Sequence, residues 1–435
     1  MFLRPLQLII SISLLILVHE LGHFVFSKLF GVRVEKFFLF FNPFFSIFKK
    51  KIGDTLYGIG WIPLGGYIKI SGIRNTNNYI DNHNFYSKSL IKRLLIISGG
   101  IIANFVLSIF IFSFFLFKNG DSKLLNKNIL YGIEINDLLD QFGLKNGDKI
   151  LSIDHNKIPY FNEINKHILL GNKIILNRNN KIINLSLSDK KKFFFDKKKI
   201  NFIVIPRTPP IINFIISNSY AEKYGLKSND EILSINYIPI MFQDQLKYKI
   251  KRFNINNKKI IIGINRNGKF LQKKFFFKKK NILGLSFKNF IELYNIFNIK
   301  VNNYSIMESL LNGLKKSEDV FKDQIFFLKN IFQIETKAYK HLGSFLSIAQ
   351  EFPNYWNWSI FLNLTAYLSI WLAFLNLIPI PSLDGGYIFF IILELIIGKK
   401  LSEKISEIFN VFGFIIISLI MIIIMIWDIF KFFHF

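Results

Sequence analysis

Two histidines and a glutamate interrupt the first apolar stretch of the chain, in the segment LVHELGHFVF at residues 17–26. His19 and His23 are four residues apart, so on a helix they share one face, and Glu20 is the next residue round. In the pattern H-E-x-x-H two imidazoles bind zinc and the glutamate activates the attacking water. A pair of surface histidines is the alternative, but ionisable groups inside a spanning segment usually face a polar cavity. The motif therefore indicates a metal site.

A catalytic zinc needs a third protein ligand. The chain has no cysteine, so this ligand must be another His, or an Asp or Glu. Asp384 is the best candidate because it follows the third apolar stretch, within NLIPIPSLDGG at residues 376–386. Two prolines end a regular helix there and two glycines allow a tight turn, so the aspartate can turn inward. A polar cap at a helix–loop junction is the alternative.

Four apolar stretches are long enough to span a bilayer, which takes about 20 residues. They cover 5–30, 94–117, 359–380 and 409–430. We expect the first to be a retained helix, since no small-residue cleavage site follows its apolar core. The loop after it is rich in Lys and Arg, which favours the cytoplasm for this loop and the outside for residues 118–358.

The composition agrees with a polytopic membrane protein. Hydrophobic residues make up 51% of the 435 residues and the mean hydropathy is +0.32. The net charge of +27 is spread over many short lysine runs, without an arginine-rich stripe. We therefore expect no nucleic acid partner.

An internal repeat lies between the second and third apolar stretches. GLKNGDKILSID at 143–154 returns as GLKSNDEILSIN at 225–236. Gly147 and Asn229 share one position, and both residue types tolerate a left-handed turn. The repeat predicts two tandem β-rich domains, each with a turn followed by a strand. Farther on, residues 304–333 have helical periodicity and could lie on the membrane surface or pack on these domains.

Several motifs together resemble the site-2 protease family of intramembrane zinc metalloproteases. These motifs are HELGH at 19–23, NLIPIPSLDGG at 376–386, GVRVE at 31–35, IPLGGYIK at 62–69 and ANF at 103–105. The resemblance covers nearly the whole chain, and the order of its parts also matches.

The resemblance implies that His19, His23 and Asp384 bind zinc and that Glu20 is the general base. Asn376 would donate a hydrogen bond to the substrate or the oxyanion, although a hydrogen bond between helices is the alternative. The segment 62–70, with Gly65, Gly66 and Tyr67, would be a membrane-facing β element that contacts an unwound substrate by strand addition. An ordinary hairpin is the alternative for it. The two repeats resemble PDZ domains, which in the family restrict access to the active site.

These features predict a polytopic α-helical membrane protein with four transmembrane helices, a membrane-associated β element and two tandem PDZ-like β-rich domains. The expected parts are transmembrane helix 1 at 1–30, a cytoplasmic loop with the β element at 31–93, helix 2 at 94–117, PDZ-like domains at 118–206 and 207–290, an amphipathic extracytoplasmic segment at 291–358, helix 3 at 359–380, an Asp-bearing loop at 381–408, and helix 4 with a tail at 409–435.

The function that the resemblance implies is that of an intramembrane zinc endopeptidase of the bacterial inner membrane, with one Zn²⁺ per chain and periplasmic PDZ-like domains. Its partners would be the lipid bilayer and single-span membrane proteins already shortened by another protease. Anti-sigma factors would be the main substrate type in regulated intramembrane proteolysis, with remnant signal peptides as a second type. The alternatives are a membrane-anchored PDZ scaffold with an inert metal site, and a metal transporter.

Overall fold

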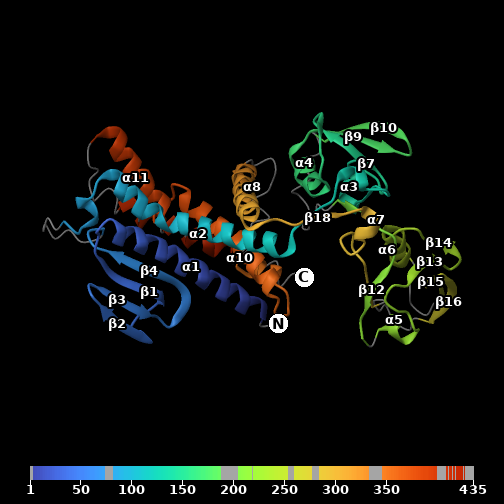
Figure 1. The fold of residues 1–435 in the computed structure, drawn as a ribbon, viewed down its shortest axis with the longest axis horizontal. Coiled ribbons are helices and arrows are strands. Elements are labelled where there is room, and N and C mark those ends of the chain that lie inside the picture. Colours follow the sequence, from blue (N-terminus) through green and yellow to red (C-terminus); the bar gives the residue numbers. More distant parts are fainter. Residues whose placement is uncertain are drawn as a thin grey trace. The chain divides into compact units, whose positions relative to one another are not determined.

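The computed structural model describes residues 3–426 except 74–81, 188–203, 218, 253–258, 277–283, 333–344, 399–407, 410, 414, 417 and 425. The chain forms two compact units (Figure 1). The first, called the helical unit below, combines Met1–Gly120 with Asn303–Phe435, and the second, called the β unit, is Asp121–Asn302.

Three helices of the helical unit are long and apolar enough to cross a membrane. They are α1 (Leu3–Leu29), α2 (Leu90–Asn119) and α10 (Trp358–Leu377), and they correspond to the first three predicted spans. The fourth predicted span, 409–430, lies partly outside the described residues, and its apolar helical stretch Val411–Ile424 is shorter than the other three. A count of four spans therefore stays a prediction.

Helix α2 is the central helix of this unit, because it contacts α1, α8 (Ile306–Phe332), α10 and α11 (Asp384–Ile397). It crosses α1 at two glycines: a Cβ on Gly22 would lie 2.1 Å from the carbonyl oxygen of Gly99. Small residues let membrane helices approach this closely. The hydroxyl of Ser369 on α10 donates to the main-chain oxygen of Asn104 on α2 at 2.7 Å. Such buried contacts hold the helices in one register.

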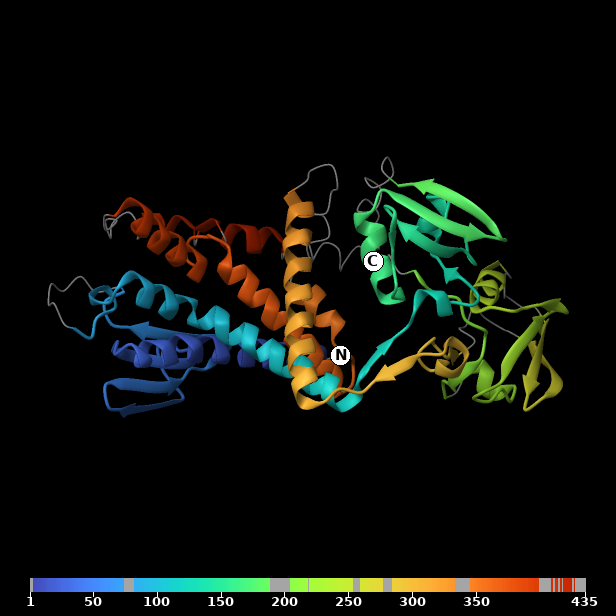
Figure 2. The same cartoon turned by 45° about the horizontal axis from the view of Figure 1, so that its top comes forward.

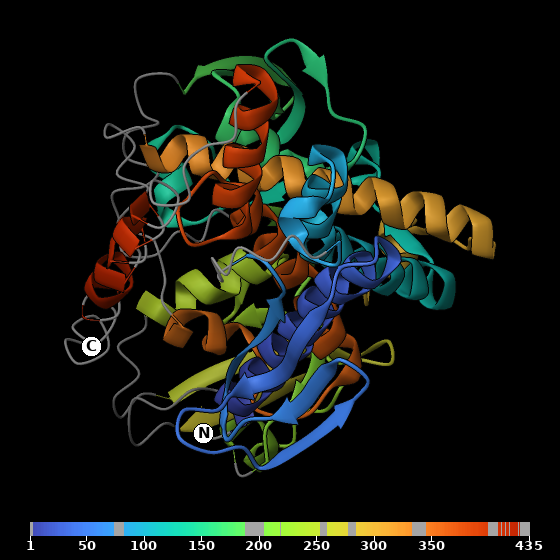
Figure 3. The ribbon, with the colours of Figure 1, turned by 90° about the vertical axis from the view of Figure 1, so that its left-hand side faces the viewer.

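The loop between α1 and α2 contains a four-stranded sheet. Its strands are β1 (Val34–Phe41), β2 (Phe48–Ile52), β3 (Thr55–Ile59) and β4 (Ile62–Ile70), in the order β2-β3-β1-β4. The sheet folds back along α1 (dark blue helix and blue strands in Figures 1 and 3), with the ring of Phe37 5.5 Å from that of Phe24. The predicted β segment 62–70 is β4, which pairs with β1 and forms an edge of the sheet.

Helix α8 confirms the helical periodicity at 304–333. It begins at a capping box: Glu308 accepts from the backbone N–H of Ser305 at 2.8 Å, and this hydrogen bond lowers the pKa of Glu308. Helix α8 packs on α2: α8 (orange) crosses α2 (cyan) in Figure 2, and a Cβ on Gly313 would lie 2.1 Å from Ser113 Oγ. Its placement on the membrane surface or on the tandem domains stays a prediction. The remaining helix of this part is α9 (Phe345–Glu351).

The β unit confirms the internal repeat as two modules with the same order of elements. The first module consists of β6 (Ile133–Glu134), α3 (Asp137–Gln141), β7 (Lys149–Ile153), β8 (Asn156–Lys157), α4 (Ile164–Leu170), β9 (Lys173–Arg178), β10 (Lys181–Ser186) and β11 (Ile205–Pro206). The second consists of β12 (Ile212–Ile215), α5 (Tyr220–Lys223), β13 (Glu231–Ile235), β14 (Ile238–Pro239), α6 (Gln243–Arg252), β15 (Lys259–Arg266), β16 (Lys269–Phe276) and β17 (Leu285–Phe287). The sheets have equivalent orders, β10-β9-β7-β8 and β14-β13-β15-β16. That these modules are PDZ domains stays a prediction.

The repeated motif makes the same buried ion pair in both modules. Asp148 lies 2.7 Å from Arg178 Nε, and Asp230 lies 2.7 Å from Arg266 Nε. These hydrogen bonds raise the pKa of both arginines. The predicted left-handed position is also present, with φ of 94° at Gly147 and 68° at Asn229. The motif therefore forms a turn that is stabilised by an ion pair with an arginine distant in the sequence.

The chain closes the β unit after the second module. Helix α7 (Tyr294–Phe297) and the residue before it add Phe297 and Leu293 to the hydrophobic core of the first module, and β18 (Lys300–Asn302) pairs with β5 (Asp121–Lys123). The sequence boundary at 290 therefore differs from the structure, in which this unit continues to Asn302. Short 3-10 turns lie at Phe85–Ser87, Asn126–Asn128 and Phe161–Glu163.

Candidate metal centre

The two histidines of the H-E-x-x-H motif lie side by side on the face of α1 that packs against α2. His19 is 8% exposed and His23 is 5% exposed. Their Nε2 atoms are 3.2 Å apart, as expected for residues four apart on one helix face.

Asp384 comes from the opposite end of the sequence. Helix α10 ends at Leu377, and α11 begins at Asp384 itself. Residues 384–397 are therefore helical, whereas the sequence analysis placed them in a loop between 381 and 408. The prolines act as expected, because they interrupt the helices only between 378 and 383. Gly385 is needed for the tight turn, since a Cβ there would lie 2.1 Å from the carbonyl oxygen of Ile378.

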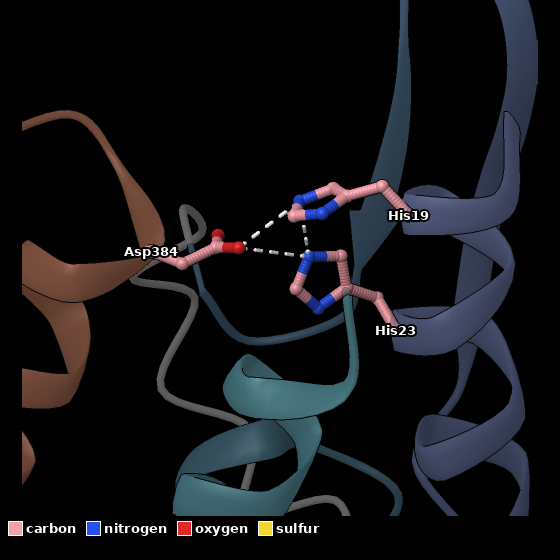
Figure 4. Close-up of side chains that lie close together, drawn as sticks. All are labelled: His19, His23 and Asp384. Carbon is pink, nitrogen blue, oxygen red and sulfur yellow. Dashed lines mark hydrogen bonds and ion pairs between the residues drawn. The ribbon is translucent and has the colours of Figure 1, made fainter. Parts of the chain in front are cut away.

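The three side chains converge on one point (Figure 4). Asp384 Oδ2 lies 3.0 Å from His19 Nε2 and 3.3 Å from His23 Nε2. A tetrahedral zinc with bonds of 2.0–2.1 Å separates its ligand atoms by about 3.3 Å. Asp384 Oδ2 is buried and makes no hydrogen bond of good geometry to the described residues. The donor set and its spacing therefore fit a zinc ion.

Helix α2 orients the two imidazoles. His23 Nδ1 lies 2.9 Å from the carbonyl oxygen of Ile96, which can only accept, so Nδ1 carries the proton and Nε2 keeps a free lone pair. The side-chain amide of Asn104 lies 3.4 Å from His19 Nδ1. Gly100 leaves room for both rings, because a Cβ there would lie 2.5 Å from His19 and 2.6 Å from His23.

Ile96, Gly100 and Asn104 carry no role that was predicted from the sequence. The spacing of Gly100 and Asn104, four residues apart in an apolar stretch, was an available signal for one functional helix face. Ile96 acts through its main-chain carbonyl, so the type of side chain at this position gives no indication of the role.

Glu20 lies next to the edge strand of the sheet. Helix α1 packs against β4, and the backbone N–H of Ile68 in that strand lies near the Glu20 carboxylate. Edge strands present main-chain groups that can pair with another extended segment. The structure thus brings together the motif glutamate and the strand that the sequence analysis proposed for substrate.

The other predicted substrate-binding residues lie near these elements, without a described hydrogen bond to the three converging side chains. Asn376 is buried in the last turn of α10. Gly65 has a φ of 85°, and Gly66 packs close to Ile16 of α1. The Tyr67 hydroxyl donates to Asn42 at 3.2 Å, so this side chain is engaged within the sheet.

The site and helices define a class of protein: a metallopeptidase with an H-E-x-x-H helix and a distant aspartate, built among apolar helices. Residues 7–420 match the sequence model of Peptidase family M50. The chain belongs to peptidase family M50, as the motifs predicted, and it is a zinc metallopeptidase.

Two relatives illustrate the similarity. The chain is 30% identical to a "Putative zinc metalloprotease" of Borreliella burgdorferi over 433 residues, which cover 93% of each chain. It is 27% identical to the "Regulator of sigma E protease" of Haemophilus influenzae over 434 residues, which cover 92% of each. These similarities and the apolar helices agree with a bacterial inner membrane protein.

Proposed function

We propose that this zinc peptidase cuts peptide bonds within transmembrane segments of single-span proteins already shortened by another protease. The observation that carries the proposal is the convergence of His19, His23 and Asp384, all largely buried, from two apolar helices. Charged and polar groups at this depth are costly unless they serve a site. The family and the relative named as a regulator of sigma E protease support anti-sigma factors as the substrate type, with remnant signal peptides as a second type.

The roles follow from the geometry. His19, His23 and Asp384 would hold one zinc per chain, and the bound zinc would supply Lewis acidity that polarises the scissile carbonyl and acidifies the attacking water. Glu20 would take the proton from that water and deliver it to the leaving amine.

An extended substrate would pair with the free edge of β4. Unwinding a helix exposes N–H and C=O groups that find no water in hydrocarbon, and an edge strand can pair with them. Main-chain groups at Gly65, Gly66 and Tyr67 would contribute, and the Asn376 amide would donate to a substrate carbonyl. We place the two modules of the β unit in the periplasm, where PDZ-like domains would exclude bulky proteins.

The mechanism predicts that Glu20→Gln lowers cleavage of a fluorescently labelled single-span substrate by about 10²–10⁴-fold, the usual contribution of a general base. Zinc content, measured by mass spectrometry of the purified protein, should stay at one per chain, because Glu20 is not a ligand. Glu318→Gln is the matched control, since that glutamate is exposed on α8.

Cleavage at the wild-type rate by the Glu20→Gln protein would refute the mechanism. One zinc per chain in a wild-type protein that cuts no spanning substrate would favour the scaffold alternative instead.

A further inference from the structure

Asn104 is a fully buried polar residue on α2 that faces a proposed zinc ligand. Its side chain is 0% exposed. The amide nitrogen lies 3.4 Å from His19 Nδ1, and the amide oxygen Oδ1 has no hydrogen-bond partner among the described residues. A buried carbonyl oxygen without a partner is rare, so this arrangement needs an explanation.

The two ends of an amide have the same shape, and only the hydrogen-bond network distinguishes them. If the nitrogen faces His19, it donates to Nδ1, and the ring proton must then sit on Nε2. That proton would point at Asp384 and remove the lone pair that a metal requires. If the oxygen faces His19 instead, it accepts from Nδ1–H and Nε2 is free. Either orientation leaves one end of the amide without a partner among the described residues, but only the second leaves His19 Nε2 free as a ligand atom.

We propose that Asn104 is a positioning residue whose amide oxygen accepts a hydrogen bond from His19 Nδ1–H and holds His19 Nε2 toward Asp384. The inference rests on the proposed role of His19 as a zinc ligand. It gives the two histidines equivalent support from α2: the Ile96 carbonyl holds His23, and the Asn104 amide holds His19. Hydrogen bonds of this kind fix the tautomer and orientation of ligating histidines.

The position of Asn104 is itself fixed. The Ser369 hydroxyl of α10 donates to its main-chain oxygen at 2.7 Å. Gly100, one turn earlier on α2, admits the His19 ring against the helix. The backbone at Asn104 is therefore tied to α10, and the His19 ring has room beside this turn of α2.

The test is a zinc affinity measurement on the full-length protein in detergent, by competition with a chelating dye. Asn104→Leu keeps the size and removes the acceptor, and it should weaken zinc binding about 10–100-fold. Asn104→Asp keeps an acceptor and should bind zinc within a few-fold of wild type. Ser108→Ala is the control, because Ser108 is equally buried one turn along α2 and should leave the affinity unchanged.

A second readout does not depend on affinity. Cobalt(II) bound in place of zinc reports ligand geometry in its visible absorption, so Asn104→Asp should keep the wild-type spectrum and Asn104→Leu should change it. If Asn104→Leu does not fold, Asn104→Asp decides alone: retained affinity and spectrum support the acceptor role, and loss of both overturns it.

Two results would contradict the inference while leaving the proposed function intact: wild-type zinc affinity in Asn104→Leu, or equal losses in the Leu and Asp variants. Failure of the proposed function looks different: the wild-type protein would bind zinc but cut no spanning substrate. Failure of the zinc site itself would appear as zinc binding that is insensitive to His23→Ala and Asp384→Asn.

Discussion

At the scale of single residues, the metal centre depends on a glycine, because a larger residue would leave no room for the histidine rings. Gly100 faces the imidazoles of His19 and His23, and a methyl group at this position would overlap both rings. The neighbouring Gly99 meets the main chain of Gly22 instead, at the crossing of α1 and α2. Two adjacent glycines thus have different purposes: one makes room for ligands, the other for a helix.

This difference predicts separate effects of two substitutions. Gly100→Ala should turn the histidine rings and weaken zinc binding by at least about 10-fold, the scale seen when support of metal ligands is lost. The thermal stability of its metal-free form should change little, because side chains can move aside. Gly99→Ala should lower the stability of the metal-free protein, because the added methyl meets backbone. Chelator competition and thermal unfolding without metal measure the two effects, and unchanged zinc affinity in Gly100→Ala would contradict this account.

At the scale of secondary-structure elements, α2 holds the two parts of the split site together. Ile96, Gly100 and Asn104 contact the histidines of α1. One turn before Ile96, Arg93 forms an ion pair with Glu394 of α11, and these residues are 6% and 8% exposed. Asp384 lies ten residues before Glu394 in α11, about 15 Å along the helix. The pair therefore joins the helix that carries the aspartate to the helix that orients the histidines.

Breaking this pair should destabilise the helical unit. Glu394→Met leaves the Arg93 charge buried and unpaired, and the expected loss is about 3–5 kcal/mol of unfolding free energy. The double variant Arg93→Met with Glu394→Met should lose much less, because neither charge remains. Denaturant unfolding in micelles of the wild type, the single variants Glu394→Met and Arg93→Met, and the double variant measures the coupling. Additive losses would show that the pair does not act as a unit. Glu318→Met removes an exposed pair on α8 and should leave stability unchanged.

At the scale of the whole molecule, the β unit is not two independent repeats in succession. The chain completes both modules and then returns to the first, where Leu293 and Phe297 join the core. Phe297 is 0% exposed. Strands β5 and β18 then pair at the two ends of the unit, so the chain enters and leaves the unit at one place.

This return predicts that a residue beyond the second module stabilises the first. Phe297→Ala should cost the first module about 3–5 kcal/mol, as for other buried phenylalanines. Hydrogen exchange on the full-length protein should then be roughly 100-fold faster or more at the protected amides of β7 and β9. Tyr294→Ala, at an exposed position of the same helix, is the control. Unchanged exchange in the first module would mean that α7 only covers its surface.

The sequence by itself determined the features that depend on short-range spacing. His19 and His23 share a face because four residues make about one helical turn. The repeated motif at 143–154 and 225–236 also has the expected left-handed φ values, at Gly147 and Asn229. Apolar length alone predicted α1, α2 and α10, and the matched motifs predicted the family. The β segment at 62–70 was also expected, because its residue pattern suits an edge strand.

Only the tertiary structure decided which distant residues meet. The position of Asp384 after the third apolar stretch made it a candidate third ligand, and the resemblance implied that role. Its contact with His19 and its place at the start of α11 depend on how α10 and α11 pack on α2. The spacing of Gly100 and Asn104 could be seen in the sequence, but their contact with His19 could not. The support from the Ile96 carbonyl and the return of Phe297 to the first module had no local signal. Contacts between segments depend on packing across the fold. The spacing of apolar residues along one helix or strand does not show which other segment its buried face will contact.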